Sequence, residues 1–151
     1  LHTMKKILIK NRKAHHDFEV LDKFEAGIVL KGHEAKSLKN GGGNFTGSFV
    51  GFEDGELYLK SFNINLYEKS TLEAYEPTRP RKLLLRKAEI LKIAGELSTK
   101  GVTLIPLTCG LEKGRVKIEI ALVRGKKKHD KRNDMKKRDQ ERRINAAISE
   151  H

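Results

Sequence analysis

Two long stretches of the chain alternate between apolar and polar side chains, which is the pattern of a β-strand with one buried face. In residues 18–30 every even-numbered position except Asp22 is apolar, and several charged side chains occupy the odd-numbered positions. Residues 115–123 alternate in the same way. Gly27 lies within the first stretch, and we expect it to mark a bend or bulge of the kind that closes a small barrel.

Shorter apolar runs predict further strands. Residues 45–52 and 56–62 are two of them. Glu53-Asp54-Gly55 between them favours a hairpin, because Asp-Gly joins neighbouring strands in tight turns. Residues 102–107 are also apolar and strand-like. Pro106 has no backbone N–H to donate, so it favours an edge or a bulge at that point.

Two segments are predicted as helices. Residues 34–39 form a short helix that ends at residues 40–43, where three glycines favour a flexible connection over a phosphate cradle because a Gly-Lys-Ser/Thr ending is missing. Residues 83–97 form the clearest helix, since apolar side chains cover about half of its circumference. Residues 63–81 predict turns. Together the elements predict a mainly β fold with a few helices, and the glycine bends favour a closed antiparallel barrel of the oligonucleotide-binding type.

Charge divides the chain into two parts. The whole chain has 32 Lys and Arg against 20 Asp and Glu, a formal net charge of +12. Residues 125–151 hold ten of these basic and five of these acidic residues, with few large apolar side chains. Such a segment cannot bury enough surface to offset the entropy of ordering it. We therefore expect an expression remnant at residues 1–3, a folded body at residues 4–124 and a basic tail at residues 125–151 that is disordered in solution.

The positive charge favours a phosphate-rich partner, and nucleic acid is the first candidate. Any one basic cluster is more often a solvated surface, but here clusters accompany nearly every predicted element. No apolar run approaches the ~20 residues that cross a bilayer. The tail also lacks the wide apolar face of an interfacial helix, so membrane binding ranks below RNA or DNA.

Catalytic and metal-binding patterns are missing from the sequence. Cys109 is the one cysteine and lies in an apolar run, where a small buried residue is favoured over a nucleophile; a lone thiol also indicates a reducing cytoplasm. The histidines are scattered without metal-ligand spacing, and no serine lies in a Gly-x-Ser-x-Gly motif. We predict a binding protein without cofactor or metal. A nuclease or RNA-modifying enzyme and a generic single-strand RNA binder are the alternatives.

Several motifs, in one order along nearly the whole chain, match a known family. They are Asn11-Arg12-Lys13-Ala14, residues 24–32, Glu34, Lys36-Ser37-Leu38, Asp54-Gly55-Glu56, Asn63-Ile64, residues 81–85, Lys117, residues 124–127 and Asp130-Lys131-Arg132. The chain resembles the SmpB (small protein B) family, also called SsrA-binding proteins. The resemblance implies an oligonucleotide-binding-type barrel with a few helices and a mobile basic tail.

The resemblance also implies a function. Family members bind the tRNA-like domain of transfer-messenger RNA (tmRNA) and deliver it to bacterial ribosomes stalled on messages without a stop codon, in the process called trans-translation. The tail is expected to pass the decoding centre, enter the empty messenger RNA channel and become helical only when bound there. The expected partners are therefore tmRNA and the ribosome, and the protein is expected to be a cytoplasmic monomer.

Candidate site residues follow from the resemblance and from the basic pattern. The resemblance ties Asn11, Glu25, Leu84 and Lys117 to RNA binding. For Glu25, an acceptor for a base amino group or ribose hydroxyl and a surface ion pair with a nearby lysine are both open. The basic pattern adds Arg12, Lys13, Lys36, Arg124, Lys126, Lys127 and Lys128. In the tail, the resemblance marks Asp130, Lys131 and Arg132, and the charge and apolar spacing adds Lys136, Lys137, Arg138 and Ile144.

Overall fold

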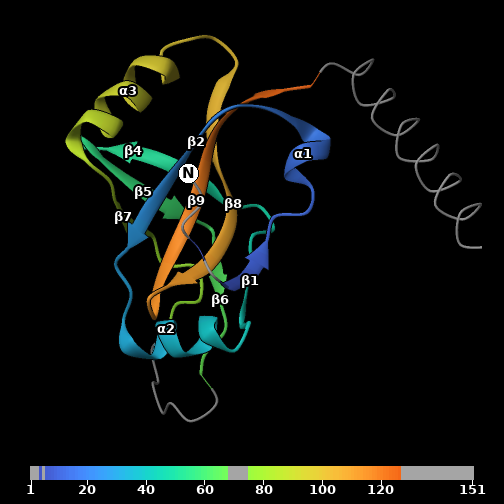
Figure 1. Cartoon of the computed structure of the whole chain (residues 1–151), viewed down its shortest axis with the longest axis vertical. Helices are drawn as coiled ribbons and strands as arrows, with labels where there is room; N and C mark the ends of the chain where they lie inside the picture. The colour runs from blue at the N-terminus through green and yellow to red at the C-terminus, as the bar shows by residue number, and fades with distance from the viewer. Residues whose placement is uncertain (1–3, 5, 68–74, 127–151) are drawn as a thin grey trace, which may run out of the picture.

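The computed structural model describes residue 4, residues 6–67 and residues 75–126 of the chain. Strands dominate this part, as predicted, and helices are few (Figure 1). In chain order the elements are β1 (Lys6–Lys10), α1 (Ala14–Asp17), β2 (Phe18–Ile28), α2 (Gly32–Lys39), β3 (Gly43–Asn44), β4 (Phe49–Glu53), β5 (Glu56–Lys60), β6 (Asn63–Ile64), β7 (Arg81–Leu84), α3 (Lys87–Leu97), β8 (Val102–Glu112) and β9 (Arg115–Gly125). None of the helices in these residues is long and apolar enough to span a membrane.

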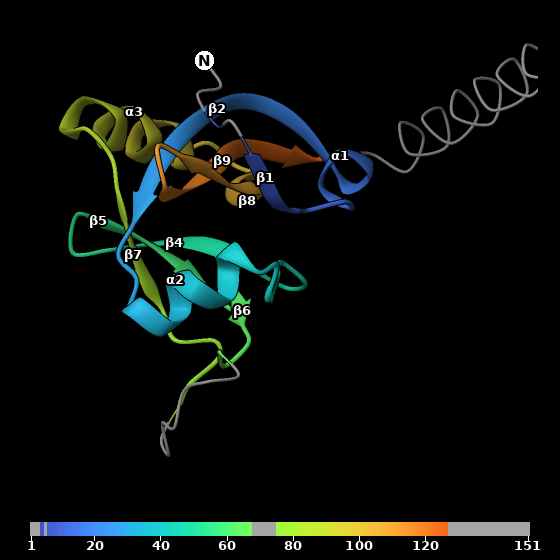
Figure 2. The same ribbon diagram turned by 60° about the horizontal axis from the view of Figure 1, so that its bottom comes forward.

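The main sheet has seven antiparallel strands in the order β1-β8-β9-β2-β7-β5-β4, and β3 pairs with β6 separately. Figure 2 shows β1, β8 and β9 in one layer and β4, β5 and β6 in the other. β1 and β4 are the two edges of the sheet, so the predicted closed barrel is wrong. The chain after β1 stays on β8 instead of reaching β4, because the backbone N–H of Asn11 donates to the Leu107 oxygen (2.8 Å) and its side-chain amide donates to the Pro106 oxygen (2.8 Å).

Strand β2 follows the predicted alternation but bulges at a different place. The register with β9 shifts between Val20 and Asp22, and the pairing at Gly27 is regular. Leu21 is the extra residue, and it changes the face of β2 on which the apolar side chains lie. Before it, Phe18 and Val20 pack on a small cluster beside α1; after it, Phe24 and Ala26 enter the main core. Asp22, the polar exception, forms an ion pair with Lys92 of α3 (2.9 Å).

Gly27 allows a close crossing of strands. It pairs with Lys117 of β9 on one side and with Leu84 of β7 on the other, so β2 links the two layers at this point. A Cβ atom at position 27 would lie 3.3 Å from the Cβ of Leu84. The expected bend is therefore replaced by a place where the absence of a side chain lets a neighbouring strand approach.

The predicted helix at residues 83–97 begins later than expected, at Lys87. Leu83 and Leu84 belong to β7, where Leu83 pairs with Ile28 and is completely buried in the main core. The predicted apolar face of the helix is also only partly buried: Leu91 is 64% exposed, and Ile93 is the buried residue of α3. Residues 83 and 84 follow the apolar spacing of a helix but form a strand, because pairing of β7 with β2 and β5 buries Leu83 in the core.

Predicted turns are better matched. Asp54 and Gly55 both have positive φ (49° and 79°), which is the tight hairpin turn that Asp-Gly favours. The register of β8 shifts between Pro106 and Thr108, so the predicted bulge is confirmed. Two of the three glycines after α2 are closely packed: a Cβ at Gly42 would lie 2.3 Å from the Ser37 Oγ, and one at Gly43 would lie 2.8 Å from Leu38. Gly41 has open space around it and a positive φ (77°), so close packing restricts only the second half of the predicted flexible connection.

A buried ion pair joins α2 to β7. Glu34 and Arg81 have 1% and 0% of their surface exposed. Arg81 donates to Glu34 from Nε (2.7 Å) and also to the Phe62 and Pro77 oxygens (2.7 and 3.0 Å). Arg79 donates to the other Glu34 oxygen (2.5 Å). Every charged atom of this cluster therefore has partners, as buried charges require.

The same contacts shift the ionisation of the glutamate. Burial raises the pKa of Glu34, but hydrogen bonds from the Lys31 N–H, Arg79 and Arg81 outweigh burial and hold it below the ordinary value of 4.5. The unfolded chain therefore takes up the proton first as the pH falls. The stabilisation is fully present above about pH 4.5 and is lost as the pH falls through the lower pKa of the folded state.

We expect Glu34→Gln to lower the free energy of unfolding at pH 7 by about 3 kcal/mol, because Arg81 keeps its buried charge without a counter-charge. Glu56→Gln is the matched control, since the Glu56–Lys82 pair is long (3.9 Å) and exposed. Urea unfolding at pH 7 and at pH 3.5 measures both. The difference between wild type and Glu34→Gln should shrink at the lower pH, and equal effects of the two substitutions at pH 7 would contradict this assignment.

Candidate nucleic-acid interface

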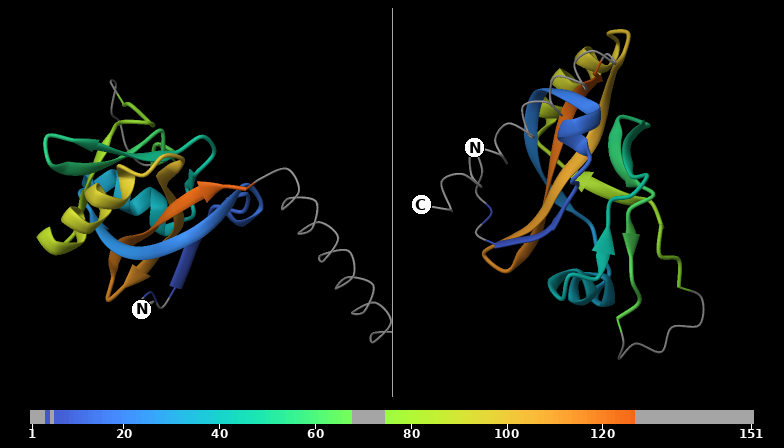
Figure 3. Two further views of the ribbon diagram at one scale, coloured as in Figure 1. Left: turned by 90° about the horizontal axis from the view of Figure 1, so that it is seen from above. Right: turned by 90° about the vertical axis from the view of Figure 1, so that its right-hand side faces the viewer.

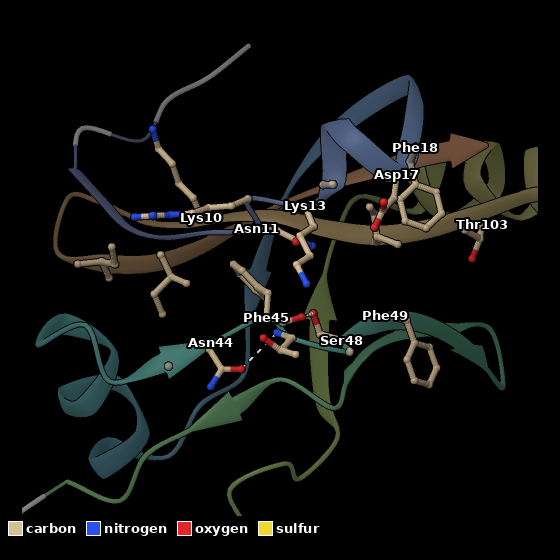
Figure 4. A pocket seen from close by; sticks show the side chains of 18 of the residues that line it. Lys10, Asn11, Lys13, Asp17, Phe18, Asn44, Phe45, Ser48, Phe49 and Thr103 are labelled. Atoms are coloured by element: carbon tan, nitrogen blue, oxygen red, sulfur yellow. Dashed lines mark hydrogen bonds between the residues drawn. The ribbon is translucent and has the colours of Figure 1, made fainter. Parts of the chain in front are cut away.

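A groove lies along the seam where the sheet fails to close. This seam groove has a volume of about 820 Å³ and is bounded by residues 8–14 on one wall and residues 44–49 on the other, with Asp17, Phe18, Gly41, Gly43, Thr103 and Ile105 completing it (Figure 4). The two walls belong to opposite layers of the fold. The seam groove therefore exists because β1 and β4 do not pair.

Both walls of the seam groove are held by hydrogen bonds. Asn11 is fixed on β8 as described above, and its carbonyl oxygen accepts from the Ala14 N–H (3.2 Å), which starts α1. On the opposite wall, Ser48 donates from its backbone N–H (2.9 Å) and its hydroxyl (2.7 Å) to the Phe45 oxygen. This turn delays the predicted strand from residue 45 to Phe49. The groove is thus shaped before any ligand arrives.

The chemistry of the seam groove is cationic and partly aromatic. Lys10, Arg12 and Lys13 line it against one carboxylate, Asp17, which is hydrogen-bonded to the His16 ring (2.9 Å). Figure 4 shows Lys13 extending from its wall toward the opposite one. Asn11 is predicted to contact RNA, and its side-chain amide donates to the Pro106 oxygen of β8, which fixes the chain just before Arg12 and Lys13.

A second hollow brings together two of the other residues that the resemblance marks, Leu84 and Lys117. This crossing hollow, of about 280 Å³, is lined by Gly27, Leu84 and Lys117 together with Lys39, Arg115 and their neighbours. Leu84 and Lys117 flank the same glycine from opposite strands, and Leu84 is 51% exposed. An exposed leucine beside three basic residues can pack on a sugar or base while the cations contact phosphates.

Glu25 lies two residues from the crossing, opposite Glu119 of β9. Neither carboxylate is without a partner in the structure. Lys117 is the diagonal neighbour of Glu25 across the β2–β9 ladder, and such neighbours lie within reach of long side chains. The geometry is therefore compatible with both alternatives for Glu25.

The remaining predicted residues are dispersed. Lys36 on α2 lies 5.9 Å from the centre of the Tyr67 ring, and Arg124 forms an exposed ion pair with Glu19 (2.9 Å). The backbone N–H of Lys126 donates to the backbone oxygen of Asp17 (3.1 Å), and its Nζ donates to the backbone oxygen of His15 (2.6 Å). Figure 3 shows the end of β9 beside α1. Residues outside the described part are Lys127, Lys128, Asp130, Lys131, Arg132, Lys136, Lys137, Arg138 and Ile144.

Cys109 is completely buried in the main core, so its predicted role as a small apolar residue is confirmed. Burial raises the pKa of the Cys109 thiol to about 12, which keeps it protonated at neutral pH. Within residues 4, 6–67 and 75–126, no group of three or more His, Cys, Asp or Glu side chains could hold a metal ion.

Phe49 is a groove residue that the sequence analysis missed. It is 45% exposed and lines the seam groove, whereas its neighbour Val50 is buried on the opposite face of β4. In the sequence Phe49 directly precedes Val50, so strand alternation places the two on opposite faces but does not say which face is buried. Only the position of β4 at the sheet edge distinguishes an exposed aromatic residue from a core residue.

Comparison with known proteins gives one consistent family. Residues 8–150 match the family model described as SmpB protein. The SsrA-binding protein of Carboxydothermus hydrogenoformans is 47% identical over 145 residues, which cover 96% of this chain and 97% of that protein. The SsrA-binding protein of Thermus thermophilus is 49% identical over 131 residues, which cover 86% and 91% of the two chains.

A solved structure described as "tmRNA-SmpB: a journey to the center of the bacterial ribosome" contains a chain of the same fold. The match has a TM-score of 0.67 and 49% sequence identity, and it covers 80% of this chain and 85% of the solved chain. Both the family model and the relatives extend over most of the sequence. The chain therefore belongs to the SmpB protein family.

Proposed function

We propose that this protein is an RNA-binding adaptor that binds the tRNA-like domain of tmRNA and brings it to stalled ribosomes for trans-translation. The observation that carries the proposal is the 49% identity, over 80% of this chain, to a chain from a tmRNA–SmpB structure. The relatives named SsrA-binding protein support the same partner. The two cationic hollows supply a physical means of binding RNA.

In this proposal the folded body holds the tmRNA. Arg12 and Lys13 at the seam groove and Lys117 at the crossing hollow contact phosphates, and Leu84 packs on a sugar or base. Glu25 accepts from a base amino group or a ribose hydroxyl. Lys36, Arg124 and Lys126 extend the positive surface. We also interpret the body as an opened relative of the oligonucleotide-binding barrel, in which the unpaired edges of β1 and β4 replace the closing pair.

The basic tail has a separate role in the proposal. The predicted tail, residues 125–151, enters the empty messenger RNA channel of the ribosome and becomes helical there. Its first two residues belong to the described body, because Gly125 ends β9 and Lys126 is hydrogen-bonded to α1. Asp130, Lys131 and Arg132 act in the channel, with Lys136, Lys137, Arg138 and Ile144 along the same helix. Lys126 anchors the start of the tail on α1 through His15 and Asp17. The protein acts as a cytoplasmic monomer without cofactor and without catalysis of its own.

Affinity for the tRNA-like domain should fall steeply with salt, because each phosphate contact releases counterions. Four or five such contacts reduce affinity by roughly 150- to 500-fold between 50 and 200 mM salt. Fluorescence anisotropy with the labelled domain measures this. Lys117→Ala should reduce the slope of log K against log salt by about one, while Lys113→Ala, in an exposed turn outside both hollows, should leave it unchanged.

An affinity independent of salt would contradict this mode of binding. The same samples distinguish the alternatives: RNA incubated with the protein and Mg²⁺ should stay intact, whereas a nuclease or modifying enzyme would alter it. A generic single-strand binder would release the tRNA-like domain to an unrelated oligonucleotide at equal concentration.

Deleting residues 127–151 should leave tmRNA binding largely intact and abolish peptide tagging on stalled ribosomes. The cut is placed after Lys126, because this residue still holds α1 by two hydrogen bonds. Anisotropy measures binding, and a reconstituted translation reaction on a message without a stop codon measures tagging. Loss of both activities, or of neither, would show that body and tail do not divide the work in this way.

A further inference from the structure

Phe49 stands out on the wall of the seam groove. It lies at one end of the groove, and Phe18 lies on the opposite wall toward the same end (Figure 4). An aromatic side chain left 45% exposed adds little to the core, and β4 already contributes Val50 there. Exposed aromatic rings beside cations are the usual stacking surfaces for unpaired bases.

The rest of the groove fits the polar parts of a nucleotide. Lys10, Arg12 and Lys13 provide the positive charge that a phosphate needs. The Ser48 hydroxyl donates to the Phe45 oxygen, which leaves its own oxygen as an acceptor for a ribose hydroxyl. The volume of about 820 Å³ is within the range of about 300–1000 Å³ that small-ligand sites occupy.

The shape of the groove selects between paired and unpaired RNA. Its two walls come from separate layers of the fold, so the groove is concave, whereas an RNA duplex presents stacked bases behind its sugar–phosphate surface. A base can reach an aromatic ring at such a site only when it has left its stack. A duplex could reach the outer cations but could not use Phe49.

We propose that the seam groove binds one unpaired RNA nucleotide, with its base stacked on the ring of Phe49 and its phosphates facing Arg12 and Lys13. This rests on the proposed function for the identity of the RNA, and it adds an aromatic stacking residue to the contacts proposed for the cations, Leu84 and Glu25. It also places that nucleotide beside α1, the element on which the tail is anchored.

Two alanine substitutions on the same strand provide the test, with Phe49→Tyr as the conservative variant. Phe49→Ala removes the stacking ring. Phe52→Ala is the matched control, because Phe52 is similarly exposed (43%) but does not line the groove. Each variant is titrated against two probes: the tRNA-like domain of tmRNA, and a single-stranded RNA hexamer with 2-aminopurine at a central position, whose fluorescence falls when the base stacks on a ring. Thermal unfolding verifies that both variants fold.

Phe49→Ala should weaken binding of both probes by roughly 5- to 150-fold and remove the 2-aminopurine quenching, while Phe52→Ala behaves as wild type and Phe49→Tyr retains the quenching. The slope of affinity against salt should not change in Phe49→Ala, because stacking releases no counterions. Equal behaviour of the two alanine variants would overturn the nucleotide site. If wild type failed to bind the tRNA-like domain, the proposed function would fail instead, and the hexamer would still test the groove.

Discussion

The Glu34–Arg81 ion pair holds α2 against β7. It ties the first turn of α2 to β7, and the same guanidinium reaches the ends of two loops at Phe62 and Pro77. β7 in turn pairs with β2, the strand that links the layers. The position of the crossing hollow therefore depends on this buried charge pair. The pair allows only one arrangement of α2 and β7, because neither buried charge can lose its partner once water is excluded.

The open seam is the second consequence of this architecture. β7 and β5 carry β4 to one edge of the sheet, and Asn11 keeps the chain after β1 on β8. Unpaired edges usually invite unwanted pairing with other chains. Here short edge strands and cationic side chains from residues 10–13 occupy the seam, so the place where a barrel would close is available for an anionic ligand.

Body and tail are joined through α1. This short helix lines the seam groove near Asp17 and accepts two hydrogen bonds from Lys126 at the end of β9. A ligand held by residues 12–13 is thus adjacent to the start of residues 127–151. The arrangement gives the start of this cationic segment a fixed point on the folded body, and its charge attracts RNA at long range.

Local patterns in the sequence determined the long strands, the Asp54-Gly55 turn, the Pro106 bulge, the burial of Cys109 and the cationic character of the surface, because each depends on neighbouring residues or on composition. The motif order was enough to identify the family. The open sheet, the strand at residues 81–84 and the exposure of Phe49 were decided by tertiary structure alone. Each depends on which distant strand lies alongside: Leu84 meets Gly27 across the layers, and β4 lacks a partner on its outer side. Periodicity along the chain carries no information about such pairings, since the same alternation of apolar and polar residues is compatible with a closed barrel and with an open sheet.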